Sequence, residues 1–196
     1  MKKFFLLSIL VAGVQFCVAQ QKDPAGTWHF MSVNSVGLIE GEAGSAFQLQ
    51  TVNGAAFKSW FGGVGVGIDY YRYRTIPLFA DFRKEFGKGS QKVFVYADLG
   101  INFSWLTDQQ KSPYVQNDHW GNGFYNDFGL GYKLALKKNN GILLSLGYSY
   151  KKVTETFQSY YVLMGTMDFI GQPGNYPTQK IDYGLNRLSI KLGWQF

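Results

Sequence analysis

Apolar and polar residues alternate along most of the chain, from about residue 30 to its last residue. Successive side chains of a β-strand point to opposite faces, so a period of two predicts strands with one apolar and one polar face. In the clearest case, residues 187–196, one face carries Leu188, Ile190, Leu192, Trp194 and Phe196. Five other segments alternate in the same way: 63–71, 76–85, 93–105, 124–136 and 142–151.

Two weaker strands, 30–39 and 45–57, precede these six. In the second, the alternation slips between Thr51 and Gly54, which indicates a β-bulge with Gly54 at the bend. The predicted total is eight strands, the smallest even number usual for bacterial membrane barrels.

The lengths of the links between strands add an independent signal. The two long links, 106–122 and about 154–180, are the fifth and the seventh, so both lie at the same end of an up-and-down array. Outer-membrane barrels have short periplasmic turns and longer outer loops, and an even strand count puts both termini on the periplasmic side. The sequence thus predicts an all-β fold, an eight-stranded antiparallel transmembrane up-and-down β-barrel.

Large aromatic residues fall into two bands when the strands are given these directions. Trp and Tyr prefer the headgroup layers of a membrane, where an apolar ring can present a polar edge. The inner band contains Trp60, Phe86, Trp194 and Phe196, and the outer band contains Tyr70, Phe103, Trp105, Phe124, Tyr148 and Tyr150. The alternative is a set of scattered core aromatics.

The first residues have the pattern of an export signal. Lys2 and Lys3 precede an apolar stretch, residues 4–14, that is too short to span a bilayer. The segment Cys17-Val18-Ala19 fits a cleavage site, so we expect a signal peptide at 1–19 and an outer-membrane β-barrel domain at 20–196. A lipoprotein acylated at Cys17 is the alternative, although Phe16 stands where that processing favours a small residue.

Charge and cysteine content exclude several classes of function. Removal of Lys2 and Lys3 lowers the formal net charge from +6 to +4, and the remaining cations are scattered, which argues against a nucleic-acid partner. Cys17 is the only cysteine, so a chain cleaved after Ala19 has no disulfide and no cysteine-based metal or redox site. No cofactor or metal is predicted.

Several segments, in this order, resemble the outer-membrane β-barrel domain family, a porin-like group of small barrels similar in architecture to OmpA and OmpX. The resemblance implies an outer-membrane location in a Gram-negative bacterium and contact with its lipid, but little about activity. The last residues, 188–196, also resemble the signal read by the barrel-assembly machinery, which makes that machinery an expected partner. The segments that carry the family resemblance are 51–54, 65–71, 76–83 and 96–100.

The polar face of the strands carries charges of both signs, which we expect to line the lumen. An eight-stranded barrel is just wide enough for side chains to fill, and unpaired buried charges would cost several kcal/mol each. We therefore predict interlocked ion pairs that plug the barrel, with Arg83 and Arg187 as forked donors; a gated ion path is the alternative. The predicted network contains Asp69, Asp81, Arg83, Glu85, Asp98, Asp127, Lys133, Arg187 and Lys191.

A catalytic site is not expected. A lipid A-modifying enzyme would need Ser, His and an acid together, but the only histidines are His29, near the inner rim, and His119 in the fifth link. His119 and Asp118 alone do not make a metal site. A narrow porin-like channel and, less strongly, such an enzyme stay as alternatives to a non-enzymatic barrel.

The long outer links are the expected contact surface for an extracellular ligand or protein. The seventh is unusually apolar in residues 160–176, which indicates either strands that continue above the membrane or a sticky surface. At the level of the fold, the rival is a soluble lipocalin-like barrel, in which the apolar face would point inward. The signal, Phe196 and the link lengths favour the membrane barrel.

Overall fold

The computed structural model describes residues 27–87, 89–106, 115–136, 140–159 and 178–196. No helix in this part of the chain is both long and apolar enough to cross a membrane. The strands are β1 (His29–Gly41), β2 (Gly44–Phe57), β3 (Trp60–Asp69), β4 (Thr75–Phe86), β5 (Gln91–Ser104), β6 (Val115–Gly121), β7 (Gly123–Ala135), β8 (Gly141–Ser159) and β9 (Thr178–Gln195).

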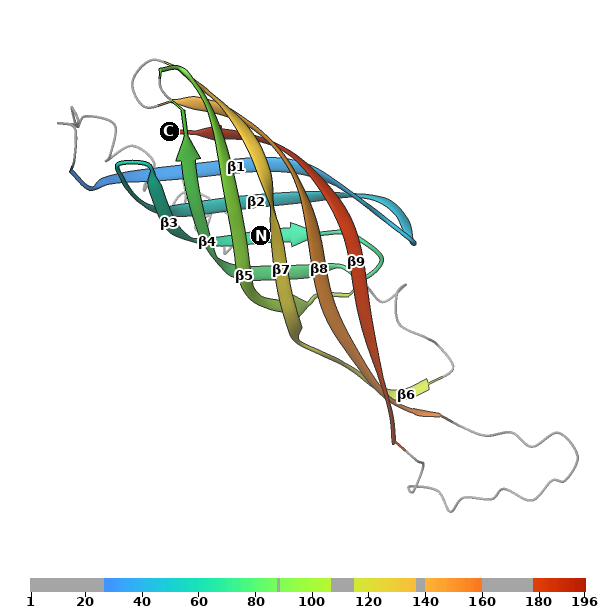
Figure 1. The fold of residues 1–196 in the computed structure, drawn as a ribbon. Helices are drawn as coiled ribbons and strands as arrows, with labels where there is room; N and C mark the ends of the chain where they lie inside the picture. The colour runs from blue at the N-terminus through green and yellow to red at the C-terminus, as the bar shows by residue number, and fades with distance from the viewer. Residues whose placement is uncertain (1–26, 88, 107–114, 137–139, 160–177) are drawn as a thin grey trace, which may run out of the picture.

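Eight of these strands form a closed barrel, as predicted. Each pairs with its neighbours in antiparallel fashion, and β9 pairs with both β8 and β1, which closes the ring (Figure 1). Following the paired residues around the barrel from Gln195 leads back to Leu185 of the same strand, ten residues away. A stagger of this kind requires strands that are tilted relative to the barrel axis.

The two ends of the barrel differ. The start of β1 and the end of β9 lie at one end, the terminal end, at the upper left of Figure 1. The adjoining ends of β2 and β3, of β4 and β5, and of β7 and β8 lie at the same end. At the other end, the loop end, β8 and β9 continue beyond the barrel and β6 pairs with β8. This three-stranded extension projects at the lower right of Figure 1.

Three local predictions are wrong. The fifth link, predicted as a loop over 106–122, contains β6, which pairs with Thr154–Ser159 of β8. The seventh link is shorter than predicted, because β8 runs to Ser159 and β9 starts at Thr178; residues 160–177 lie outside the described residues. β2 has no bulge, because its register with β1 and β3 is unbroken through Gly54.

The reason for the apparent slip in β2 is a change in what the inside of the barrel contains. Gln48 and Gln50 point inward near the loop end of β2, whereas the inward residues Val52 and Ala56 belong to an apolar layer nearer the terminal end. The backbone alternation continues while the inward chemistry changes from polar to apolar. The other members of this layer are Met31, Val33, Phe61, Phe79, Phe94, Tyr96, Tyr125 and Leu143.

Glycines make space for the rings of this layer. A Cβ added at Gly131 would lie 2.1 Å from the ring of Phe94, and one added at Gly65 would lie 2.4 Å from the ring of Phe79. At both positions the ring that fills this space belongs to a phenylalanine.

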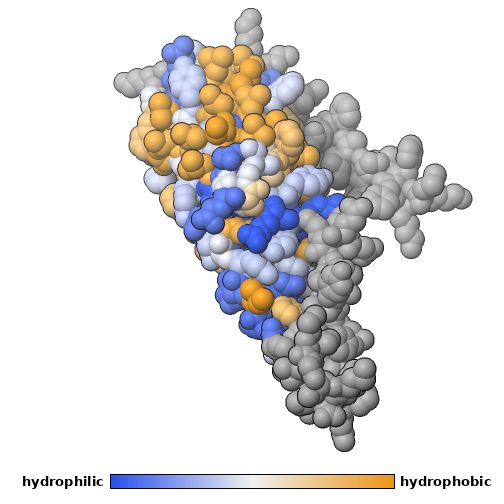
Figure 2. All heavy atoms as spheres, turned by 90° about the vertical axis from the view of Figure 1, so that its right-hand side faces the viewer, coloured by the Kyte–Doolittle hydropathy of each residue, from blue (hydrophilic) through white to orange (hydrophobic). Residues whose placement is uncertain are grey.

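The outer face of the barrel carries an apolar belt. Leu188, Ile190, Leu192 and Trp194 are 53–61% exposed, while Ser189 and Lys191 between them are buried. The same orientation holds on the other strands, and Figure 2 shows the apolar surface gathered over the barrel, with a more hydrophilic surface toward the loop end. The prediction that the alternating apolar face points outward is confirmed. The inside of the barrel holds the apolar layer described above together with many buried polar and charged residues, unlike the apolar interior expected of a lipocalin-like barrel.

Candidate functional site: the charged lumen and its two ends

Nearest the loop end, two cations share one carboxylate. Asp69, the last residue of β3, accepts a hydrogen bond from Nη1 of Arg187 on β9, and Nζ of Lys151 on β8 lies 3.1 Å from its carboxylate. Arg187 also donates to Ser149 at 2.6 Å. All three charged side chains are fully buried, so this cluster connects β3, β8 and β9 across the lumen.

Farther down the barrel, two carboxylates share one cation. Nζ of Lys191 on β9 lies 3.1 Å from Asp127 and 3.4 Å from Asp98. Asp127 accepts further hydrogen bonds from Tyr96 at 2.8 Å and Ser189 at 3.1 Å. This arrangement is the inverse of the Asp69 cluster, so the two together balance their charges.

Arg83 forms the third lumen cluster with Asp81, two residues away on β4. Its Nε and Nη2 donate to the carboxylate of Asp81 at 2.8 and 2.5 Å, a forked contact. The guanidinium also lies 5.6 Å from the ring centre of Phe61 and 5.8 Å from that of Phe94. Four buried carboxylates thus meet four cations, and each has at least one partner of opposite charge.

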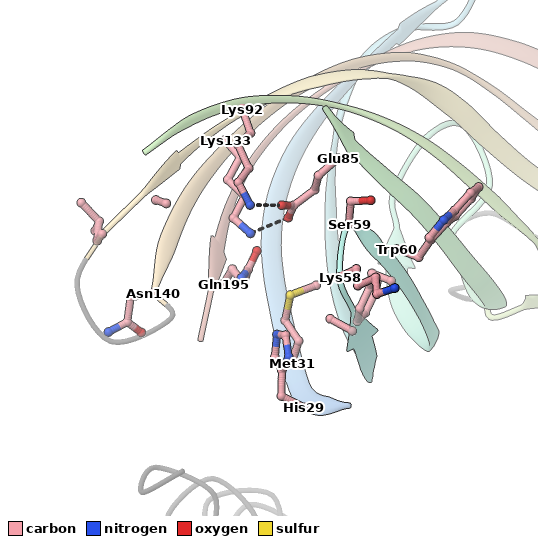
Figure 3. Close-up of a pocket in the computed structure, with 14 residues that line it drawn as sticks. His29, Met31, Lys58, Ser59, Trp60, Glu85, Lys92, Lys133, Asn140 and Gln195 are labelled. Atoms are coloured by element: carbon pink, nitrogen blue, oxygen red, sulfur yellow. Dashed lines mark hydrogen bonds and ion pairs between the residues drawn. The ribbon is translucent and has the colours of Figure 1, made fainter. Parts of the chain in front are cut away.

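Glu85 and Lys133 lie apart from these clusters, at the terminal end. Glu85 accepts hydrogen bonds from Lys133 at 2.5 Å and from Lys92 at 2.8 Å (Figure 3). The ion pairs border an open cavity of about 210 Å³, whose lining includes His29 and Lys58. Inside the barrel, the cavity between Arg83, Tyr96 and Lys191 measures only about 10 Å³, about enough for one water molecule.

Some lumen residues are missing from the set selected from the sequence. Lys151 stands on the polar face of its strand, but only the structure places it against Asp69. Tyr125 is fully buried, and its hydroxyl accepts hydrogen bonds from Gln48 at 3.1 Å and Gln50 at 2.9 Å. Its place in the alternation is the only signal that could have identified it.

Aromatic side chains gather over the lumen at the loop end. The ring of Tyr73 lies 4.7 Å from that of Trp120 on β6 and 5.1 Å from that of Tyr183 on β9. The backbone carbonyl of Tyr73 accepts a hydrogen bond from Lys151 at 2.8 Å, so this group of three aromatic residues lies next to the Asp69 cluster. Burial, with a hydrogen bond to Glu155, raises the pKa of the Tyr183 hydroxyl.

The two histidines lie at opposite ends of the barrel. His119 lies exposed on β6 opposite Thr156, at the loop end, whereas His29 lines the cavity at the terminal end. Among the described residues, no three His, Cys, Asp or Glu side chains gather in a way that could hold a metal ion.

Comparison with known proteins places the fold. No protein-family model matches the chain, and no curated protein matches its sequence. Among solved structures, the outer membrane protein OprG from Pseudomonas aeruginosa is similar, with a TM-score of 0.54 and 11% identity over 88% of this chain and 96% of that one. Neisserial surface protein A is also similar, with a TM-score of 0.51 and 13% identity over 88% and 98%. The chain therefore has the fold of the small, eight-stranded outer-membrane β-barrels.

Proposed function

We propose that this chain is a non-enzymatic outer-membrane protein whose barrel is plugged by its own side chains and whose loop end is the contact surface. The observation that carries the proposal is the lumen, where four carboxylates and four cations are paired and the cavity between Arg83 and Lys191 is about 10 Å³. An eight-stranded barrel has little internal room, and paired charges held in place leave no wide path for solutes.

The apolar belt supports the membrane location. An exposed apolar surface this continuous is unfavourable in water and favourable against lipid chains. A closed barrel also pairs the backbone groups of its strands, as a membrane-spanning segment requires. In this proposal the terminal end faces the periplasm, as short turns do in this fold. The C-terminal residues Leu188, Ile190, Leu192, Trp194 and Phe196 serve as the barrel-assembly signal.

The extension supports a contact role for the loop end. It carries hydrophilic outward pairs, such as Lys152 with Asp182 at 2.8 Å, beyond the apolar belt. Long loops on a rigid scaffold are the usual position of binding residues. The partner would be an extracellular ligand or protein.

A narrow channel for small solutes is the second candidate, favoured by the open cavity beside Glu85. In a planar bilayer, we expect the wild-type protein to give no stepwise conductance. A Tyr125→Ala/Arg187→Ala variant removes the two largest fully buried lumen side chains and should open measurable steps, which shows that the assay detects an open barrel. Heat-modifiable gel mobility confirms that each sample is folded.

The opposite result would favour the channel. Steps from the wild-type protein, with an ion selectivity that changes in an Asp98→Lys variant, would refute the plugged barrel. Absence of the protein from the outer-membrane fraction of cells would refute the proposed location.

A further inference from the structure

One part of the lipid-facing wall is polar. Ser32 and Asn34 on β1 stand at outward positions with the exposed residue Val36, and on β2 Thr51 and Asn53 stand with Leu49. Ser32 itself is only 1% exposed, so Asn34, Thr51 and Asn53 form the accessible part of this surface. Ser32 pairs with Asn53, and Asn34 with Thr51, in the β1–β2 ladder. The four side chains, here called the polar wall, therefore lie side by side on adjacent strands.

The polar wall lies within the apolar belt and not at its border. Along β1, Phe30 comes before it and Val36 and Leu38 follow, and all three are 45–49% exposed. Along β2, the exposed Phe47 and Leu49 precede it toward the loop end. In the proposed location, hydrocarbon chains therefore surround Asn34, Thr51 and Asn53, whereas Ser32 is covered by its neighbours.

None of the four side chains makes a hydrogen bond to another residue within the part of the chain that the structure describes, and the hydroxyl of Ser32 is buried without a partner. Polar groups that face hydrocarbon without a hydrogen-bond partner cost free energy. Ordinary packing against lipid would favour Leu or Val at these positions, as at most other outward positions of the belt. The described part of this chain therefore supplies no hydrogen-bond partner for the polar wall.

The surface is also hollowed beside the polar wall. Asn34 and Thr51 line an open groove of about 530 Å³ together with Leu49, Val66, Ile68 and Ile76. A protein surface can fill such a groove and reach the polar groups at the same time, whereas a lipid chain offers no hydrogen bonds.

We propose that the polar wall is the contact between two copies of this chain in the membrane. The inference rests on the proposed outer-membrane location. Two copies inserted in the same direction are related by a two-fold axis along the membrane normal, which brings the same patch together at the same depth. Asn, Ser and Thr side chains each donate and accept hydrogen bonds, so the patch is complementary to itself. It holds no charge that would require a different partner.

Sedimentation equilibrium in density-matched detergent micelles tests the contact. We expect the wild-type protein to dimerise and an Asn34→Leu/Thr51→Val variant to dimerise roughly tenfold more weakly, because hydrogen bonds within membranes each contribute modestly. Asn126→Leu is the matched control, since it removes an outward amide from β7, a strand that is not part of the polar wall. It should dimerise as the wild type does.

Cross-linking in cell membranes gives a second measurement that does not depend on the double variant folding. Asn53→Cys should form a disulfide-linked dimer on oxidation, and Leu144→Cys, exposed on β8, should not. A wild-type protein that is monomeric in micelles, with no excess cross-link at residue 53, would overturn the dimer. If that monomer is found in the outer-membrane fraction, the proposed location still stands; if it is absent from that fraction, both fail.

Discussion

An Asp69→Ala variant is expected to lose about 3–5 kcal/mol of unfolding free energy, the cost of removing one partner from a buried ion pair. Asp69 is the carboxylate shared by Arg187 and Lys151, and all three side chains are fully buried. Its removal leaves two cations facing each other in the lumen without a counter-charge. Urea unfolding in lipid vesicles, followed by tryptophan fluorescence, measures the change.

Asp182→Ala is the matched control for this prediction. Asp182 also pairs with a lysine, Lys152, but the two side chains are 45% and 40% exposed. Solvent screens such a pair, so its loss should cost far less than the loss of Asp69. Equal small losses in both variants would mean that water reaches the Asp69 cluster and that the lumen is not sealed there.

Arginine on the lipid-facing wall should cost free energy according to its depth. Leu146 lies in the middle of the belt part of β8 and is 59% exposed. In lipid vesicles, Leu146→Arg should therefore destabilise the barrel by about 2–4 kcal/mol. Ile142, the second residue of β8, lies at the terminal end of the belt, and Ile142→Arg should cost only about 0–1 kcal/mol.

The comparison of the two arginine variants isolates the effect of lipid. Both replace an outward aliphatic residue of one strand, so strand propensity and lost packing are similar. Equal costs at the two depths would indicate that the belt does not sit across a bilayer.

The alternation of residues was enough to predict the eight barrel strands, whereas the export signal, Phe196 and the link lengths were needed to predict which face points outward. In segments such as 187–196, each inward position differs in polarity from its outward neighbours. β6 has no such pattern: its sequence, Val-Gln-Asn-Asp-His-Trp-Gly, is mostly polar. It forms a strand because the projecting part of β8 offers a free edge, which is a property of the tertiary structure.

The ion-pair partners in the lumen depend on geometry that the sequence does not display. Alternation indicated that Asp69 and Arg187 point to the polar face, but they lie 118 positions apart. The ten-residue stagger of the ladder brings them to one depth with Lys151. The slip of the alternation in β2 led to the wrong prediction of a bulge for a related reason. The polarity of inward residues in this barrel varies with depth, and not only with the face of the strand.

Spin labels placed one at a time at residues 188, 189, 190, 192 and 193 in lipid vesicles give the most direct test of the membrane-facing wall. Oxygen concentrates in hydrocarbon, whereas a nickel chelate stays in water. We expect labels at Leu188, Ile190 and Leu192 to collide with oxygen far more than with the chelate, and labels at Ser189 and Gly193 to meet little of either. Free access of the chelate to positions 188, 190 and 192 would contradict the account.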